Sequence, residues 1–505
     1  MAEFFSEWAY VPVVLAQVFS SPMVLVYLLI GLVLGYTVGV IPGLGPTMGM
    51  ALLLGIVFKL VPLEGMALLI GVMVASLSSG GITASLVNIP GTSAAAATTL
   101  DGYPMTKQGK GRDAAGLSYM SSVIGSILGT IFIFLIQPFV ASIALKFGDW
   151  EVFLFCLFGV LICGSLAGDK PIKGWIAAAA GFFLAMTGAD SVQSVVRYTF
   201  GRTELLSGYD TVVAMIGLFG MSEVFYVLIK KEKKMEYKQE QGFPRIRLDI
   251  LAKNKLNIMR STLVGLWVGF IPGVGESAAC WLSYDVAKRS SKTKEQFGKG
   301  NPEGVIAAET ANNASSVGAL IPALALGVPG SATAAIFIAA LFMMNHRPGP
   351  TLMLDSPGIL AQICVLFLLG AILMIGIGYV LTRYVIRFLT IPNKYLMPIV
   401  TVFCALGAYG STYTWSSVIF VLLFGLIGAV MKLYQYPIAP MVLGLLVGNI
   451  ADSSLRRALM QYSHNPLEMV TRPFGIAVIV VLVIMFILGV KTNITQEDVE
   501  KEIEE

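Results

Sequence analysis

Two stretches of this chain are too long and too apolar for a water-soluble fold. Residues 65–100 contain no Asp, Glu, Lys or Arg, and residues 304–345 contain only one of them, Glu309. One membrane-spanning helix needs about 20 apolar residues, so each stretch is longer than a single helix. Across the 505 residues, 56% are hydrophobic and 13% are charged, against about 25% charged in soluble proteins. The chain is therefore predicted to be an all-α polytopic membrane protein with about 10–12 transmembrane helices.

Composition also excludes several function classes. The net charge of +4 is small and its basic part lies in loops between apolar runs, which indicates membrane topology and no nucleic-acid binding. The two histidines and five scattered cysteines argue against a metal centre or a disulfide framework. The sequence contains no Walker motif, so direct use of ATP is not expected. We expect no cofactor beyond a coupling ion.

Each long apolar stretch is interrupted by a Pro-Gly pair. Pro90-Gly91 lies in the first and Pro329-Gly330 in the second. Proline removes a backbone donor and glycine permits a sharp turn, so each stretch is predicted to be a helix followed by a broken or re-entrant segment. Non-helical backbone at membrane depth is tolerated only where protein or a water-filled cavity surrounds it.

The Pro-Gly breaks belong to an internal repeat. Residues 39–45 (GVIPGLG) match residues 269–275 (GFIPGVG) at an offset of 230, and residues 88–93 (NIPGTS) match residues 327–332 (GVPGSA) at an offset of 239. Two breaks thus occur in the same order in each half. Broken apolar segments at corresponding positions of two halves are the best sequence indication of a transporter's binding site.

The basic loops indicate that the two copies face opposite ways. A basic loop, Lys107–Arg112, follows the second break of the first half, whereas Lys288–Lys299 follows the first break of the second half. If both loops are cytoplasmic, the repeats have inverted topology. Counting membrane crossings onward from these loops places Arg456, Arg457 and Arg472 outside, on the side opposite the cytoplasm. This fits poorly with the positive-inside rule, by which basic loops lie in the cytoplasm.

The predicted organisation follows from these motifs. It comprises a first repeat at 1–229 with motifs at 39–49 and 85–105, a basic cytoplasmic linker at 230–257, a second inverted repeat at 258–472 with motifs at 269–285 and 304–350, a final transmembrane helix at 473–490, and a charged tail at 491–505.

The breaks carry the groups that an anion site needs. A Gly-rich break followed by Ser or Thr and a resumed helix exposes backbone N–H groups beside hydroxyls at a positive dipole end. For one such motif alone, close helix packing would be the favoured interpretation; four in two matching pairs favour substrate binding. The candidate substrate-binding residues are Pro42, Gly43, Gly45, Thr47, Asn88, Pro90, Gly91, Thr92, Ser93, Pro272, Gly273, Gly275, Ser277, Pro329, Gly330, Ser331 and Thr333.

Polar residues inside the second long stretch are candidates for cation coupling. Glu309, Asn312 and Asn313 lie in an otherwise apolar run, and an intramembrane ionisable group is a functional hypothesis by default. Glu309 either coordinates a cation, or is protonated, or pairs with Lys299 or Arg289 at the interface. For Asp101 and Glu276, at the edges of breaks, a structural role is favoured.

Several longer motifs resemble those of the large membrane subunit of tripartite tricarboxylate transporters, the TctA family. They are residues 85–93 (SLVNIPGTS), 100–105 (LDGYPM), 297–300 (FGKG), 303–305 (EGV), 309–314 (ETANNA), 326–333 (LGVPGSAT) and 347–350 (RPGP), and the resemblance covers about residues 20–450. It implies a secondary transporter of di- or tricarboxylates in the bacterial inner membrane, coupled to a Na⁺ gradient or, as the other choice, to H⁺. It also implies a small four-helix membrane subunit and a periplasmic substrate-binding protein as partners, and a substrate site at the paired Pro-Gly motifs.

Similarity to elevator-type transporters implies that the motif-bearing part moves against a fixed scaffold and, by analogy, that the protein is a homodimer. Two other functions stay open at this point. One is a stand-alone permease for carboxylates or other small solutes that works without a binding protein. The other is an intramembrane enzyme using Asp101, Glu309 and Ser331, although no protease-like acid pair or metal-ligand cluster supports it.

Overall fold

The computed structural model describes residues 6–41, 44–165, 171–190, 192–230, 242–385, 393–472, 475–476 and 479–480. Over these residues the chain is almost entirely helical, and the two strands β1 (Gly188–Ala189) and β2 (Val196–Arg197) pair in an antiparallel hairpin. The predicted all-α fold is confirmed. The predicted final helix at 473–490, the tail at 491–505 and residues 231–241 of the linker fall wholly or mostly outside the described residues.

Among the described residues, eight helical segments are long and apolar enough to cross a membrane. They are α3 (Pro22–Val40), α5 (Pro62–Val87), α7 (Gly111–Ala144), the continuous segment α10 (Thr211–Met215), η4 (Ile216–Met221) and α11 (Ser222–Ile229), then α19 (Ile359–Thr382), α21 (Asn393–Thr412), α22 (Trp415–Leu433) and α23 (Ile438–Gln461). The segment η4 is a π-helix. The chain is thus a multi-pass membrane protein.

Shorter helices lie beside the breaks. These are α4 (Gly45–Val57), α6 (Thr99–Lys107), α13 (Lys255–Phe270), α14 (Gly275–Ser290), α15 (Pro302–Gly318), α16 (Leu320–Leu326) and α17 (Ala332–Met343). At 1.5 Å per residue none of them spans the roughly 30 Å apolar core alone. The remaining elements are η1 (Ser6–Tyr10), α2 (Val11–Ser20), η2 (Ser93–Ala95), α8 (Asp149–Ser165), α9 (Pro171–Ala185), η3 (Thr203–Leu205), α12 (Leu248–Lys253), η5 (Lys294–Gln296), α18 (Leu352–Asp355) and α24 (Pro466–Val470).

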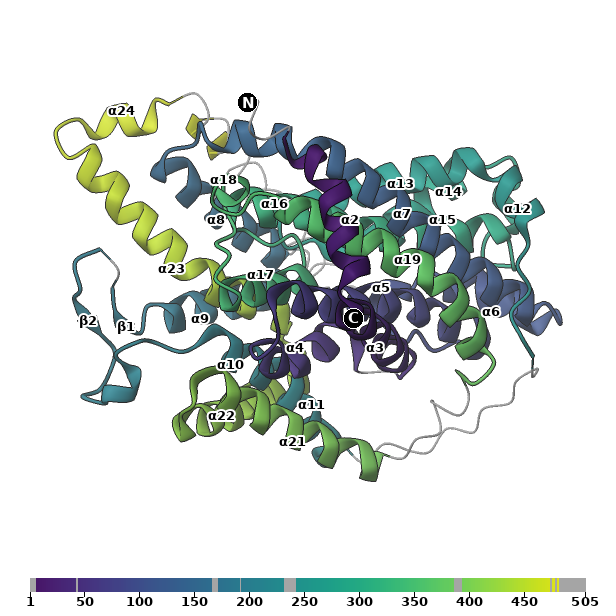
Figure 1. Ribbon diagram of the computed structural model, residues 1–505, viewed down its shortest axis with the longest axis horizontal. Coiled ribbons are helices and arrows are strands. Elements are labelled where there is room, and N and C mark those ends of the chain that lie inside the picture. The colour runs from purple at the N-terminus through teal and green to yellow at the C-terminus, as the bar shows by residue number, and fades with distance from the viewer. Residues whose placement is uncertain are drawn as a thin grey trace, which may run out of the picture.

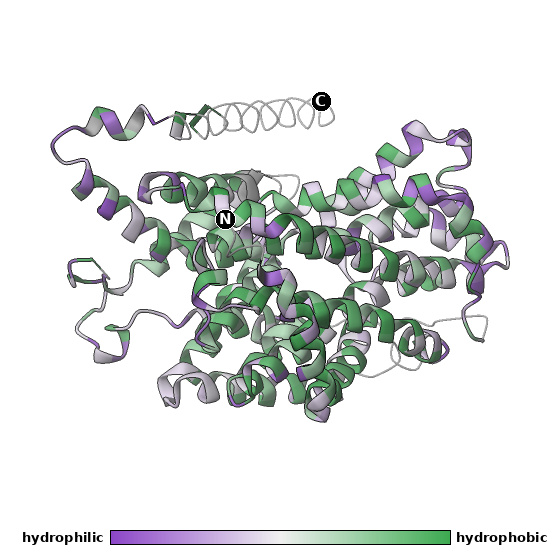
Figure 2. Ribbon diagram, turned by 45° about the horizontal axis from the view of Figure 1, so that its top comes forward, coloured by the Kyte–Doolittle hydropathy of each residue, from purple (hydrophilic) through white to green (hydrophobic). Residues whose placement is uncertain are grey.

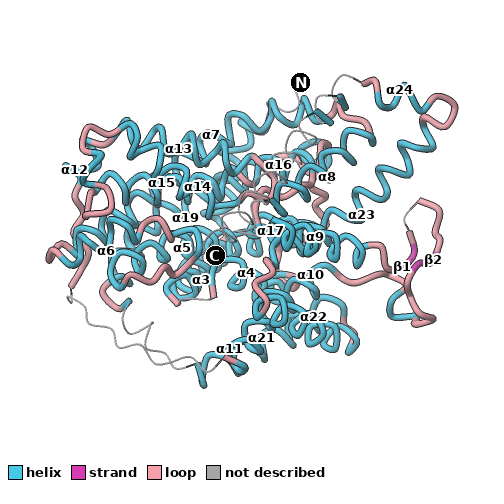
Figure 3. The backbone as a smooth tube through the Cα atoms, turned by 180° about the vertical axis from the view of Figure 1, so that it is seen from behind, coloured by secondary structure: helices cyan, strands magenta, loops and turns pink. Residues whose placement is uncertain are grey.

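The helices form two groups, and each group contains helices from both halves of the chain. In one group α3 packs on α5, α13 on α15, α15 on α7 and α19 on α5. In the other, α23 from the second half packs on α8 and α9 from the first, and the π-helical segment from the first half packs on α21 and α22 from the second (Figures 1 and 3). Both α5 and α15 are buried along almost their whole length, so the segments that lead to the second breaks are enclosed by protein.

Matching contacts accompany the sequence repeat. A Cβ atom at Gly35 of α3 would lie 2.5 Å from the carbonyl oxygen of Val72, and one at Gly265 of α13 would lie 2.4 Å from the carbonyl oxygen of Ala311. These pairs are related by the offsets of 230 and 239 that relate the motifs. Small residues let helix backbones approach this closely. The two copies therefore share a helix crossing as well as a sequence pattern.

The two basic loops contact each other. The side-chain Nε2 of Gln108 donates to the carbonyl oxygen of Lys299 at 2.7 Å. Hydrophilic residues gather around this end of the molecule, near α6, α12 and the ends of α13 and α14 (Figures 1 and 2). Loops in contact lie on one side of a membrane, which is what the predicted inverted repeat requires.

We expect cysteines that replace Lys110 and Lys292 to react with an impermeant thiol reagent from the same, cytoplasmic, side. Phe200→Cys is the opposite-side control, because Phe200 is 85% exposed in the loop between α9 and α10, which the topology places outside. The measurement uses a chain whose native cysteines are replaced. Labelling of positions 110 and 292 from opposite sides would reject the inverted arrangement.

The three arginines that fit the charge rule poorly have acidic partners. Arg456 contacts Asp452 at 3.1 Å, Arg457 contacts Asp149 at 2.8 Å, and Arg472 contacts Glu151 at 2.8 Å. Counting crossings from Lys107–Arg112 also places residues 197–202 outside, and Arg197 pairs with Asp452 at 2.8 Å. These ion pairs stabilise the arginines locally, but the rule counts Lys and Arg and gives Asp and Glu little weight, so these positions still fit it poorly.

Candidate functional site: a cavity between the helix breaks

The first break of each half is a glycine turn that restarts a helix. Gly45, Gly273 and Gly275 have φ angles of 61°, 80° and 70°, a backbone region that favours glycine. Among the described residues, no side chain caps the first turn of α4 or of α14. The N-terminal N–H groups of both helices are therefore available to an anion. Pro42 and Gly43 lie outside the described residues.

The second break of each half crosses the first at close range. The N–H of Gly91 donates to the carbonyl oxygen of Gly80 at 3.3 Å, and the N–H of Gly330 donates to that of Ala319 at 3.2 Å. A Cβ atom at Gly91 would lie 1.9 Å from the carbonyl oxygen of Gly39, and one at Gly330 would lie 2.3 Å from that of Gly269. The two breaks of each half thus contact each other in the structure.

All four break regions meet at one cavity of about 510 Å³. This volume is within the range of about 300–1,000 Å³ that is usual for small-molecule sites. From the breaks its wall takes Leu44, Gly45, Pro46, Thr47, Met48, Pro90, Gly91, Thr92, Ser93, Ala94, Gly273, Val274, Gly275, Glu276, Ser277, Ser331, Ala332 and Thr333.

The remaining candidates lie beside the cavity. Asn88 ends α5 in the left-handed conformation and is exposed. Pro272 faces Gly159 of α8, and Gly330 packs on Ala319. Pro329 lines a small adjoining pocket. These residues shape the turns, whereas their neighbours supply the groups that face the cavity.

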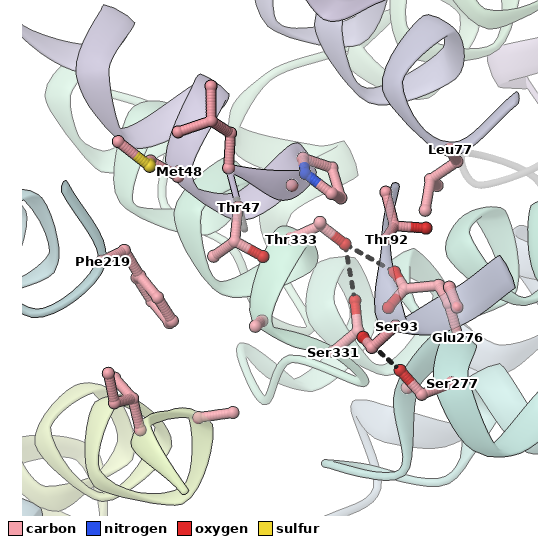
Figure 4. A pocket seen from close by; sticks show the side chains of 18 of the residues that line it. Thr47, Met48, Leu77, Thr92, Ser93, Phe219, Glu276, Ser277, Ser331 and Thr333 are labelled. Atoms are coloured by element: carbon pink, nitrogen blue, oxygen red, sulfur yellow. Dashed lines mark hydrogen bonds between the residues drawn. The ribbon is translucent and has the colours of Figure 1, made fainter. Parts of the chain in front are cut away.

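Hydroxyl groups in the cavity wall form hydrogen bonds with one another, and one of these bonds connects the two halves of the chain. Ser93 and Ser277 share a hydrogen bond of 2.7 Å, and Ser331 and Thr333 share one of 2.8 Å (Figure 4). The hydroxyl of Thr92 is buried and makes no hydrogen bond among the described residues. It packs against α5, since a Cβ atom at Gly80 would lie 2.7 Å from it.

One acid lies in the wall. The hydroxyl of Thr333 donates to Oε1 of Glu276 at 2.6 Å, and Figure 4 shows both side chains beside Ser331. Sequence reasoning favoured a structural role for Glu276, because its position at the edge of a break gives no sign of which way the side chain points.

The other face of the cavity comes from elements that the sequence analysis did not single out. Phe219 in the π-helix η4, Lys432 in the last turn of α22, and Tyr436, Ile438 and Ala439 at the start of α23 line it. A lysine at the end of an apolar run also fits simple anchoring at the membrane surface, so its sequence position alone is not informative.

Glu309 lies in a separate buried cluster. Its carboxylate accepts hydrogen bonds from Thr98 at 2.5 Å and Ser122 at 2.8 Å, and a Cβ atom at Gly81 would lie 2.0 Å from Oε1. Of the alternatives for Glu309, the ion pair with Lys299 or Arg289 is not formed among the described residues, where Arg289 contacts Asp285 at 2.7 Å.

The amide groups of α15 belong to the same polar region. Oδ1 of Asn313 accepts from Ser78 at 3.3 Å and from Ser126 at 3.4 Å, and its Nδ2 donates to the carbonyl oxygen of Glu309 at 3.1 Å. Asn312, on the same helix, is fully buried.

Asp101 makes hydrogen bonds that connect two segments of the protein. Its Oδ1 accepts from the N–H groups of Gly298, Gly300 and Asn301 at 2.8–2.9 Å, and Oδ2 accepts from the hydroxyl of Tyr284 at 2.8 Å. Burial raises the pKa of Asp101 while these hydrogen bonds lower it. The carboxylate thus joins α6 to the second basic loop. Asp101, Glu309 and Ser331, the residues considered for an intramembrane enzyme, each bind different partners. Among the described residues, no group of three His, Cys, Asp or Glu side chains could hold a metal ion.

Comparison with known proteins gives the family. The sequence model of the tripartite tricarboxylate transporter TctA family matches residues 25–443. An uncharacterized 52.8 kDa protein in the TAR-I ttuC' 3'region of Agrobacterium vitis is 31% identical over 466 residues, which cover 91% of this chain and 92% of that protein. An uncharacterized protein in the TAR-II ttuC' 3'region of the same organism is 29% identical over 230 residues, 46% of this chain and 95% of that protein. No solved structure matches significantly. The chain belongs to the tripartite tricarboxylate transporter TctA family and is a membrane component of a transporter.

Proposed function

We propose that this chain is the large permease subunit of a tripartite transporter that takes up a di- or tricarboxylate across the inner membrane. The observation that carries this proposal is the single cavity walled by all four breaks. Uptake is driven by a cation gradient, with Na⁺ as the expected ion. Substrate arrives from a periplasmic binding protein, and a small four-helix membrane subunit completes the assembly.

The cavity has the chemistry of a carboxylate site. The uncapped first turns of α4 and α14 offer backbone N–H groups, and Ser93 and Ser277 place hydroxyls beside them. Helix N-termini attract anions because unpaired N–H groups and the helix dipole act together. One substrate carboxylate would bind there.

The charge balance of the cavity supports cation coupling. Among the described residues that line it, Lys432 is the only basic residue and Glu276 the only acid. A substrate with two or three negative charges therefore needs additional positive charge. Co-bound cations would supply it, and Glu276 or the cluster of Glu309, Asn312 and Asn313 would hold them.

The transport cycle that we propose is alternating access. The helices that carry the breaks would move against α8, α9, α21, α22 and α23, as in elevator-type transporters, and a homodimer would hold this scaffold in place. Because the cavity wall draws on both groups of helices, their relative movement would open it to one side at a time.

Replacing Na⁺ by choline at fixed pH is expected to reduce uptake of the substrate to background. The measurement uses proteoliposomes or cells that contain the complete three-component system, with a parallel series at constant Na⁺ and varied pH. Uptake that is unaffected by choline but follows the pH gradient would show that H⁺, and not Na⁺, is the coupling ion. Uptake that is independent of both would remove cation coupling.

The partners are tested separately. Co-purification of this chain with a four-helix subunit, and loss of uptake without the binding protein, are expected. Full uptake by this chain alone would favour the stand-alone permease instead.

A further inference from the structure

A lysine stands in the cavity wall contributed by α22, η4 and α23, whereas the breaks supply the hydroxyls and helix N-termini. Lys432 and Phe219 line the cavity together with Ser277, Ser331 and Thr333. Figure 4 shows Phe219 across the cavity from Ser331 and Thr333. A molecule that fills this cavity therefore meets two different surfaces.

The ammonium group of Lys432 has one charged partner among the described residues. It donates to Oε2 of Glu223 in α11, forming an ion pair. The side chain of Glu223 is 11% exposed, whereas that of Lys432 is 26% exposed. A lysine ammonium carries three N–H donors, so the pair with Glu223 leaves donors for a ligand.

We propose that Lys432 binds a second carboxylate of the substrate, while the breaks bind the first. This inference rests on the proposed function and adds a residue that selects for charge. A monocarboxylate would satisfy the breaks and leave Lys432 with Glu223 alone. A dicarboxylate or tricarboxylate would satisfy both surfaces, so Lys432 distinguishes substrates by the number of their carboxylates.

Glu223 has a definite part in this arrangement. It neutralises and orients Lys432 when the cavity holds no substrate, because an unpaired charge in a low-dielectric region is costly. When a substrate carboxylate arrives, Lys432 can bridge it and Glu223 at once. Removing Lys432 alone would leave Glu223 buried and unpaired, which could unfold the protein and obscure the result.

The experiment therefore compares the double variant Lys432→Met/Glu223→Gln with the single variant Glu223→Gln. Both lack the acid, and they differ only in the lysine. Binding is measured by isothermal titration on the full chain in nanodiscs with NaCl. The probes are succinate, malate and tartrate, each compared with its monoamide, and citrate, compared with its diamide, so that every comparison ligand keeps one carboxylate.

We expect the double variant to bind the di- and tricarboxylates about ten- to a hundredfold more weakly than Glu223→Gln does, the usual effect of losing a charged hydrogen bond. Its affinity for the amides should change little. Lys173→Met is the matched control: Lys173 donates to the carbonyl oxygen of Tyr434 beside the same loop and is not in the cavity wall, so the preference for the second carboxylate should persist.

Two results would overturn the assignment in different ways. If the double variant keeps the preference of Glu223→Gln for the acid over its amide, Lys432 does not bind the second carboxylate, and the proposed function is unaffected. If the wild-type chain binds none of the four acids, the proposed function fails and the role of Lys432 fails with it.

Discussion

Replacing Ser277 by leucine is expected to abolish uptake while the protein still assembles in the membrane. Ser277 lies in the first turn of α14, lines the cavity and shares a 2.7 Å hydrogen bond with Ser93 from the other half of the chain. A leucine side chain would fill the space beside the helix N-terminus and exclude a carboxylate. Uptake by proteoliposomes, with the amount of folded protein measured by size-exclusion chromatography, checks this expectation.

Ser277→Ala is the matched control, because it removes the hydroxyl and keeps the space. It should retain part of the uptake, since one neutral hydrogen bond contributes only about 0.5–1.5 kcal/mol. A leucine at Ser93, which shares the hydrogen bond with Ser277 and also lines the cavity, should have the same effect as Ser277→Leu. Normal uptake in both bulky variants would refute the assignment of the cavity as the substrate site.

Glu309→Gln is expected to uncouple uptake from the cation gradient. Glu309 is completely buried and binds two hydroxyl groups, and no ion pair with it is formed among the described residues. A buried carboxylate of this kind either binds a cation or carries a proton. Glutamine has the same shape but carries no charge and takes up no proton, so it would hold a cation more weakly, and accumulation against a gradient should fall to background while substrate exchange at equal concentrations continues.

Asp285→Asn is the control for loss of a carboxylate on the neighbouring helix α14. The side chain of Asp285 is 47% exposed and pairs with Arg289, and an exposed pair of this kind has little energetic weight. Its cation dependence should match that of the wild type. If Glu309→Gln also keeps the wild-type cation dependence, Glu309 has no part in coupling.

The breaks could be predicted from the sequence because their causes are local. Uncharged residues continue on both sides of Pro90-Gly91, so only the dipeptide could end the helix, and α5 does end at Val87. The offsets of 230 and 239 also predicted which segments correspond, and the glycine contacts of α3 and α13 repeat at those offsets. Here the local chemistry and the packing agree.

The rest depended on packing between distant segments. Runs 258–271 and 273–287 are apolar enough to suggest two crossings, but they form the short helices α13 and α14 on either side of a turn. Lys432 lies 155 residues from Ser277 in sequence, and no pattern in α22 indicates that its side chain lines the same cavity. Likewise, the acids that balance Arg457 and Arg472 lie about 300 residues earlier.

The most direct measurement is a cryo-EM map of the purified chain with a saturating dicarboxylate and NaCl. If the paired breaks form the substrate site, the dicarboxylate density lies in the cavity between Ser277 and Thr333, with one carboxylate at the N-terminus of α14. Dicarboxylate density at another place, with this cavity empty or closed by side chains, would contradict the assignment.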